Sequence, residues 1–142
     1  MAFKEKLAWV TLGSMLIAYG AYFAKLASAA RAGAPPMMNM LIWFAGITIA
    51  QVIAIAIVTA VLAILAQREA NAPADERDRA IARRAGNSAY YVLMVGVILV
   101  GVVMPFSEPA WKIINAALLS LVVAEAVRYI LIILSYRRGW HG

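Results

Sequence analysis

A glutamate and an arginine lie inside an otherwise apolar stretch in the last quarter of this sequence. Glu125 and Arg128 are three residues apart, a spacing that places two side chains on the same face of a helix. A charge inside a membrane-spanning helix costs about 2.5–3.5 kcal/mol on insertion scales, so it normally faces protein or water and has a partner. This pair is therefore the strongest chemical signal in the chain.

Two interpretations of the pair remain open. In the first, Glu125 and Arg128 neutralise each other and lock their helix against its neighbours. In the second, Glu125 is the proton- or ion-coupling carboxylate of a small transporter or channel. A coupling carboxylate must lose and regain its proton, whereas a neighbouring arginine favours the ionised form. The structural interpretation is therefore favoured.

Other polar side chains fall at a similar predicted depth. At 1.5 Å per helical residue, Arg128 and Glu125 lie about 12 and 16 Å below the nearer membrane surface, and Ser14 and Thr59 about 10 and 12 Å. With Thr11 and Tyr91, these residues are expected to form one intramembrane polar cluster. Such hydroxyl groups more often tie helices together than bind substrate.

Gln51 stands alone in the second apolar stretch, nearer the opposite membrane surface, and belongs to the same predicted set of intramembrane polar residues. An amide at this depth normally bonds a neighbouring helix. Asn115 and Ser120 are the expected partners.

The elements that position these residues are four apolar stretches. Hydrophobic residues make up 65% of the chain and charged residues 14%, against roughly 45–50% and about 25% in soluble domains, and the mean hydropathy is +0.83. The sequence predicts one all-α domain over residues 1–142, an integral membrane bundle of four transmembrane helices. The predicted spans are 7–24, 40–66, 89–104 and 111–134.

The two halves show a weak internal similarity. A shift of 74 residues aligns Leu7 with Ile81, Ser14 with Ser88 and Gln51 with Glu125. Each half would be a two-helix hairpin, and two crossings per half would give the halves the same orientation. Duplicated helical hairpins and chance matches between small apolar residues are both open explanations.

Residues 67–88 form the one charged connection. Asp75 is the expected N-cap of a short amphipathic helix leading into the third span, and its spacing lets it pair with Arg79. The alternating charges make this segment the candidate contact for a partner; the residues concerned are Asp75, Glu76, Arg77, Asp78, Arg79, Arg83 and Arg84.

The basic residues predict orientation and partners. Nine Lys and Arg residues fall on the side of the termini and the 67–88 segment, and three on the other side. The positive-inside rule then predicts a multi-pass protein of the cytoplasmic (inner) membrane with both termini in the cytoplasm. The net charge of +6 sits beside apolar stretches, which indicates contact with the lipid bilayer and no nucleic acid.

Several function classes have no support in the residues. There is no cysteine and only one histidine, so thiol chemistry, cysteine-bound metal and a two-histidine haem site are excluded. No glycine-rich phosphate loop and no Ser/His/Asp set is present. We expect no enzyme activity, no cofactor and no metal.

A family resemblance rests on Asp75-Glu76-Arg77-Asp78, Ile81 and Tyr90-Tyr91-Val92-Leu93. On these residues the chain resembles the small four-span bacterial membrane proteins of unknown function grouped as DUF2178, and the resemblance covers about 25 residues. The resemblance implies topology and no activity. The expected function is an accessory or interaction subunit of a membrane complex, or a homo-oligomer, and the alternative is a small ion- or proton-coupled transporter or channel that uses Glu125.

Overall fold

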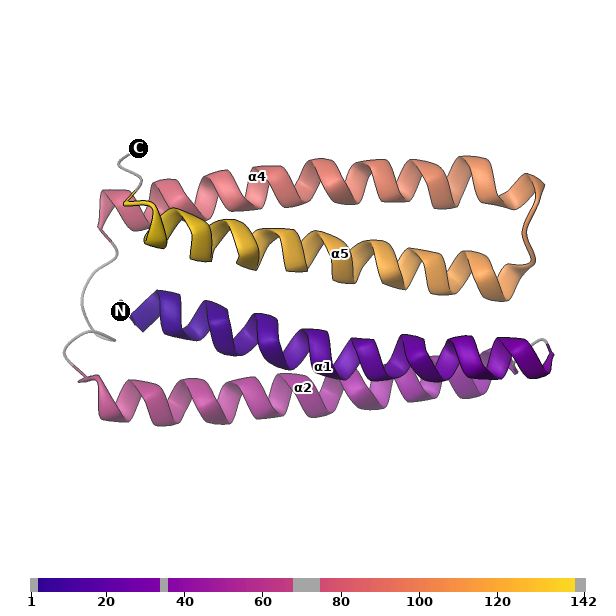
Figure 1. Ribbon diagram of the computed structural model, residues 1–142, viewed down its shortest axis with the longest axis horizontal. Helices are drawn as coiled ribbons and strands as arrows, with labels where there is room; N and C mark the ends of the chain where they lie inside the picture. Colours follow the sequence, from indigo (N-terminus) through magenta and orange to yellow (C-terminus); the bar gives the residue numbers. More distant parts are fainter. Residues whose placement is uncertain (1–2, 34–35, 68–74, 140–142) are drawn as a thin grey trace.

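The computed structural model describes residues 3–33, 36–67 and 75–139. Long helices make up almost all of this part of the chain (Figure 1). They are α1 (Phe3–Ala32), α2 (Met37–Leu65), α4 (Glu76–Ile98) with its extensions η1 (Leu99–Val103) and η2 (Met104–Phe106), and α5 (Ala110–Arg137). The expected all-α class is confirmed.

Four helices are long and apolar enough to cross a membrane. They have 28 to 31 residues, which at 1.5 Å per residue is about 42–46 Å, longer than the roughly 30 Å hydrocarbon core. The ends of the helices therefore extend into the headgroup layers or the helices tilt. The short amphipathic helix expected before the third span is the first part of α4 and is continuous with it.

The last turns of the third span change helical form. The backbone widens into the π-helical η1 and then tightens into the 3₁₀ turn η2, which contains Pro105. Proline has no N–H to donate to the preceding turn, and its ring clashes with the carbonyl group of the residue four positions earlier. The helix therefore ends at Phe106, just beyond the expected stop.

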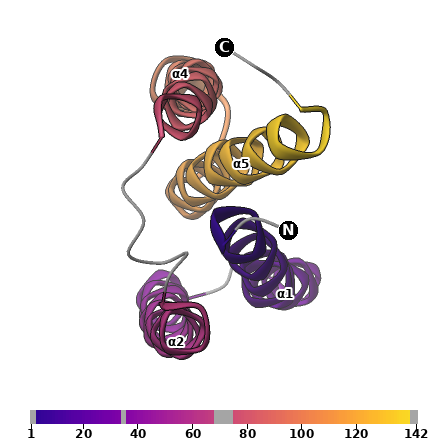
Figure 2. The same ribbon diagram turned by 90° about the vertical axis from the view of Figure 1, so that its left-hand side faces the viewer.

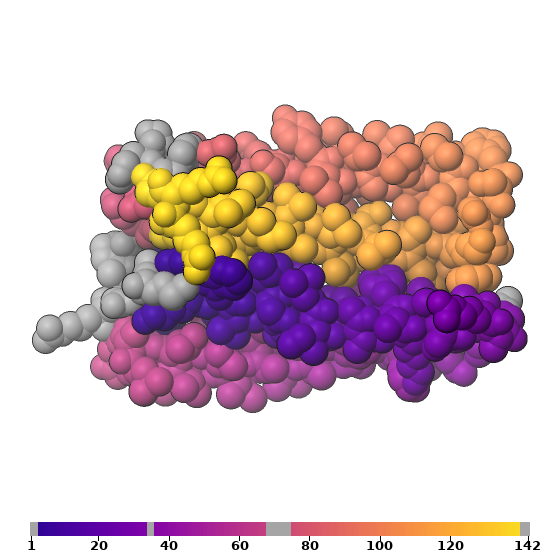
Figure 3. All heavy atoms as spheres, in the orientation of Figure 1, coloured from indigo at the N-terminus to yellow at the C-terminus, as the bar shows by residue number. Residues whose placement is uncertain are grey.

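The four helices pack in a fixed lateral order rather than as a closed square. α4 packs against α5, α5 against α1, and α1 against α2, while α2 packs extensively only against α1. Figure 2 shows α1 and α5 in the middle, with α4 and α2 at opposite sides. In Figure 3, α1 and α5 lie side by side along one face of the molecule.

The buried core follows from this order. Ala8, Leu12 and Met15 of α1 form one buried cluster with Ile133 of α5, whereas α2 has no buried residue. A 74-residue duplication would make the α2–α4 contact equivalent to the α1–α5 contact, but only the latter is extensive. The packing is therefore not two-fold symmetric, and the duplication stays a sequence-level prediction.

A close helix contact joins Gly96 of α4 to Ser120 of α5. A Cβ atom added at Gly96 would lie 2.6 Å from the Ser120 Cβ atom. Small residues at a crossing let two membrane helices approach closely, which raises their van der Waals contact. This contact fixes the position of α5, and so of Glu125, relative to α4.

Candidate functional site

The expected ion pair on α5 is formed. An Arg128 guanidinium nitrogen lies 3.5 Å from a Glu125 carboxylate oxygen, and the two side chains are 44% and 41% exposed. The pair is thus not enclosed by the helices of this chain. Its outer half is open to whatever surrounds α5.

Glu125 also lines a cavity of about 190 Å³ between α1, α2 and α5. We call it the central cavity. Its walls are Thr11, Met15 and Tyr19 from α1, Phe44, Gln51, Val52 and Ile55 from α2, and Leu121, Val122, Glu125 and Tyr129 from α5. Because Val52 is 62% and Leu121 47% exposed, the cavity is open on one side. The structure therefore brings Glu125 and Gln51 to one space.

Gln51 does not form the bonds expected for it. Its Oε1 atom is buried and has no hydrogen-bond partner within the described ranges. The Asn115 side chain instead accepts a hydrogen bond from the Tyr22 hydroxyl at 2.6 Å, and the Ser120 hydroxyl donates to the Ala116 carbonyl on its own helix. The predicted bridge from Gln51 to Asn115 or Ser120 is therefore wrong.

The remaining members of the predicted polar cluster lie elsewhere. The Ser14 hydroxyl donates to the Thr11 carbonyl at 3.0 Å, Thr59 is half-buried on α2, and Tyr91 is 61% exposed. None of the three lines the central cavity. Depth along a helix was predicted from residue counts, but the face on which each side chain lies depends on packing.

A second polar group joins three helices at one end of the molecule. Lys4 of α1 donates to Asp78 Oδ2 at 2.7 Å, and the Tyr136 hydroxyl of α5 donates to Asp78 Oδ1 at 2.5 Å. Asp78 thus holds the ends of α1, α4 and α5 together. The sequence analysis missed this group because it assigned Asp78 to contact with a partner. The group could have been predicted from the positions of Lys4, Asp78 and Tyr136, which all lie near span ends on the same side of the membrane.

Electrostatics in this group follow from its hydrogen bonds. Asp78 and Tyr136 both lie outside the predicted spans. Burial alone would raise the pKa of the Asp78 carboxyl, but the hydrogen bonds from Lys4 and Tyr136 outweigh it, so the pKa lies below the ordinary 3.8. Burial and the bond to Asp78 raise the pKa of the Tyr136 hydroxyl, which therefore remains a donor at neutral pH.

The rest of the charged segment is arranged as follows. Asp75 caps α4, accepting from the Glu76 backbone N–H at 2.7 Å, as expected. The predicted Asp75–Arg79 ion pair is not formed between these two described residues. Glu76, Arg79 and Arg83 have exposed side chains, and Arg77 and Arg84 have contacts of their own. Residues 68–74 of the expected connection lie outside the described residues.

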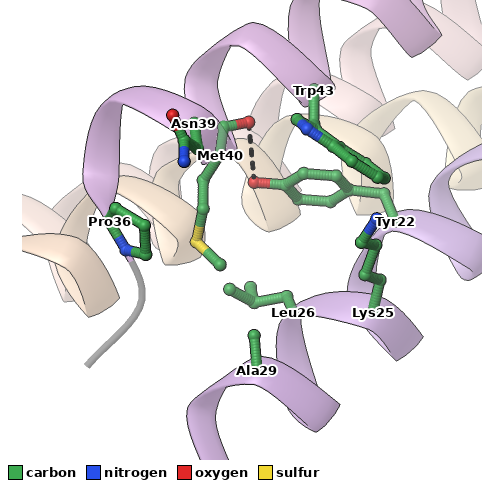
Figure 4. Close-up of a pocket in the computed structure, with 8 residues that line it drawn as sticks. All are labelled: Tyr22, Lys25, Leu26, Ala29, Pro36, Asn39, Met40 and Trp43. Atoms are coloured by element: carbon green, nitrogen blue, oxygen red, sulfur yellow. Dashed lines mark hydrogen bonds between the residues drawn. The ribbon is translucent and has the colours of Figure 1, made fainter. Parts of the chain in front are cut away.

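A pocket of about 220 Å³ lies between α1 and α2 at the opposite end of the molecule (Figure 4). The Tyr22 hydroxyl lies 3.5 Å from the Met40 carbonyl oxygen, and the Lys25 ammonium lies over the Trp43 ring, 2.7 Å from its centroid. Leu26, Ala29 and Pro36 complete the apolar wall. Tyr22, Lys25 and Asn39 are its polar lining residues among those that the structure describes.

Within the described residues, no group of three His, Asp or Glu side chains could hold a metal ion. The central cavity, with one carboxylate and one amide, is the arrangement best suited to bind a complementary group.

These features define an integral membrane protein whose intramembrane polar groups are left open on one side. The chain belongs to the family described as predicted membrane protein (DUF2178), whose model matches residues 4–140. The match extends the resemblance from a short segment to nearly the whole chain. No curated protein and no solved structure matches.

Proposed function

We propose that this protein is a non-enzymatic interaction subunit of the cytoplasmic membrane, which contacts another membrane protein, or a second copy of itself, at the open side of the central cavity. The observation that carries the proposal is the position of Glu125. Its side chain is 41% exposed, about 16 Å below the nearer membrane surface. A carboxylate left against hydrocarbon is costly, so a partner that covers it is favoured.

The packing of α2 supports the same proposal. Exposed apolar side chains on α2 are suited to lipid and need no partner of their own. Gln51 is different, because a buried acceptor without a hydrogen bond costs about 1–3 kcal/mol. A partner helix at the open side of the central cavity would cover Glu125, and its donor side chain would reach Gln51 Oε1 once the buried amide turns toward the cavity.

The exposed charged residues of α4 would form the part of this interface that lies outside the membrane, in water. Glu76, Arg79 and Arg83 are exposed at the end of the molecule where most basic residues lie. By the positive-inside rule this end is cytoplasmic. Alternating charges there favour a partner with a complementary cytoplasmic edge, and they set orientation more than affinity.

Mild detergent extraction of the tagged chain from its native membrane tests the proposal. We expect a discrete partner, or a dimer of the chain, to co-purify with the wild type. Glu125→Gln should reduce recovery of that partner more than about tenfold, as expected for removing one charge from a covered pair. Glu108→Gln is the matched control, because Glu108 pairs with Lys112 in an exposed turn. A monomer without partner in every sample would contradict the proposal.

A second candidate function is ion- or proton-coupled transport. The observation that favours it is the juxtaposition of Glu125 and Gln51 in the lining of one cavity, whose volume of about 190 Å³ is large enough for a small cation or water. Purified protein in sealed vesicles discriminates between the two. Cation or proton flux that Glu125→Gln abolishes and Glu108→Gln preserves would make transport the leading function; flux at background would leave the interaction role.

A further inference from the structure

A third cavity, of about 270 Å³, lies between α1, α4 and α5 at the end of the molecule that carries Asp78. We call it the basal cavity. One wall is apolar and consists of Leu7, Ala8, Ile81, Ala82 and Ile132. The lining also includes the charged residues Lys4, Asp78 and Arg79, which we call the polar wall, and Tyr129 and Tyr136; most of the cavity surface is apolar.

The polar wall carries a positive charge, that of Arg79, for which no described residue forms an ion pair. Asp78 accepts hydrogen bonds from Lys4 and Tyr136, so its negative charge is already balanced. Arg79 is exposed and forms no ion pair with any described residue. The Lys4 side chain is 43% exposed, and its ammonium group retains two N–H groups beyond the one it gives to Asp78.

The basal cavity lies at the boundary between hydrocarbon and headgroups. Leu7 begins the first predicted span and Ile132 lies near the end of the fourth, whereas Lys4 and Tyr136 flank those spans. The apolar wall therefore meets the upper part of the acyl chains, and the polar wall meets the phosphates. Basic pockets between membrane helices at this level are the sites where anionic headgroups bind.

We infer that the basal cavity binds an anionic phospholipid, with its phosphate at Arg79 and Lys4 and the start of an acyl chain against the apolar wall. This site is separate from the central cavity and does not depend on the proposed function. The ligand chemistry is a phosphate joined to an alkyl chain. A free phosphate provides the first part only, and a zwitterionic lipid carries a cation beside its phosphate.

Native mass spectrometry of the full chain in detergent tests this inference, using phosphatidylglycerol, phosphatidylcholine and glycerol phosphate as probes. We expect saturable retention of one phosphatidylglycerol and weaker retention of phosphatidylcholine. Arg79→Gln should weaken phosphatidylglycerol binding about fivefold, the effect of one cation near an anionic surface. Arg83→Gln is the matched control, because Arg83 is exposed on the same helix but does not line the cavity.

A second variant tests the apolar wall without changing charge. Ala82 is exposed at the cavity, so Ala82→Leu is expected to fold and to reduce phosphatidylglycerol retention by filling the space. Equal loss in Arg79→Gln and Arg83→Gln would show diffuse attraction and overturn the site. If glycerol phosphate competes and Ala82→Leu binds phosphatidylglycerol as the wild type does, the cavity is a site for a free anion. That result would overturn the inference that its ligand is a phospholipid.

Discussion

The Lys4 ammonium lies 2.7 Å from a carboxylate oxygen of Asp78, although 74 residues separate the two in sequence. Lys4 is in the second position of α1, and Asp78 is in the first turn of α4. With the Tyr136 hydroxyl on the other carboxylate oxygen, this contact joins three helices where their apolar spans end. The charged segment before the third span is thus partly used for a contact within the chain. We call this contact between Lys4, Asp78 and Tyr136 the clamp.

Asp78→Asn should lower the free energy of unfolding by about 1–2 kcal/mol, because it weakens two hydrogen bonds to a charged acceptor. Lys4→Met should cost less than about 1 kcal/mol, since the Lys4 side chain is 43% exposed and solvent screens its charge. Denaturant-induced unfolding in detergent measures both. Asp75→Asn is the control, because asparagine also caps helices. A loss as large in Asp75→Asn as in Asp78→Asn would contradict the clamp.

The stability of the protein should fall in acid because of Asp78. A carboxyl whose folded-state pKa lies below its unfolded value of 3.8 contributes stability above that value. The contribution is lost as pH falls through the lower, folded-state pKa. Thermal unfolding in detergent between pH 7 and pH 3 should show a drop below about pH 4 that is smaller in Asp78→Asn. Parallel curves for the two proteins would contradict this origin.

Gly96→Ala should destabilise the α4–α5 contact. The added Cβ atom would lie 2.6 Å from the Ser120 Cβ atom, which cannot move without its backbone. Such overpacking costs about 1–3 kcal/mol. Gly46→Ala is the control, because a Cβ atom at Gly46 meets nothing within 4 Å. Unfolding in detergent should separate the two variants, and equal stability would show that the helices do not approach as described.

Gln51→Leu should stabilise the isolated chain by about 1 kcal/mol, because it removes a buried acceptor that has no hydrogen bond. The same variant should weaken association with a partner, if that partner supplies the missing donor. Stabilised but less functional variants are typical of binding sites. A destabilised Gln51→Leu variant in detergent would indicate that Gln51 is bonded within the chain.

The four helices, the Asp75 cap and the Glu125–Arg128 pair could be predicted because each depends on short-range pattern. Apolar length predicts a span, and a three-residue separation predicts a shared helix face. The faces of Ser14, Thr59 and Tyr91 could not be predicted in the same way. Lipid is as apolar as a protein interior, so a membrane helix does not show by polarity which side packs against its neighbours.

Contacts between side chains that are distant in sequence could not be predicted either. From the sequence alone, Asp78 could contact solvent, a partner or the end of any span. The packing of α1 and α5 against α4 determines that its hydrogen-bond partners are Lys4 and Tyr136. Gln51 had several partners at suitable depth, but Asn115 is held by Tyr22 of α1. Residue type predicted which side chains need a partner, and helix packing determined which of them obtain one.

Site-specific photo-crosslinking in native membranes tests the central claim most directly. A photoreactive residue at Val52 lies on the open wall of the central cavity, and one at the neighbouring Ile53 is similarly exposed but does not line it. We predict that Val52, and not Ile53, forms a discrete protein adduct, which Glu125→Gln diminishes. Lipid adducts alone at both positions would contradict the claim that a membrane protein covers Glu125.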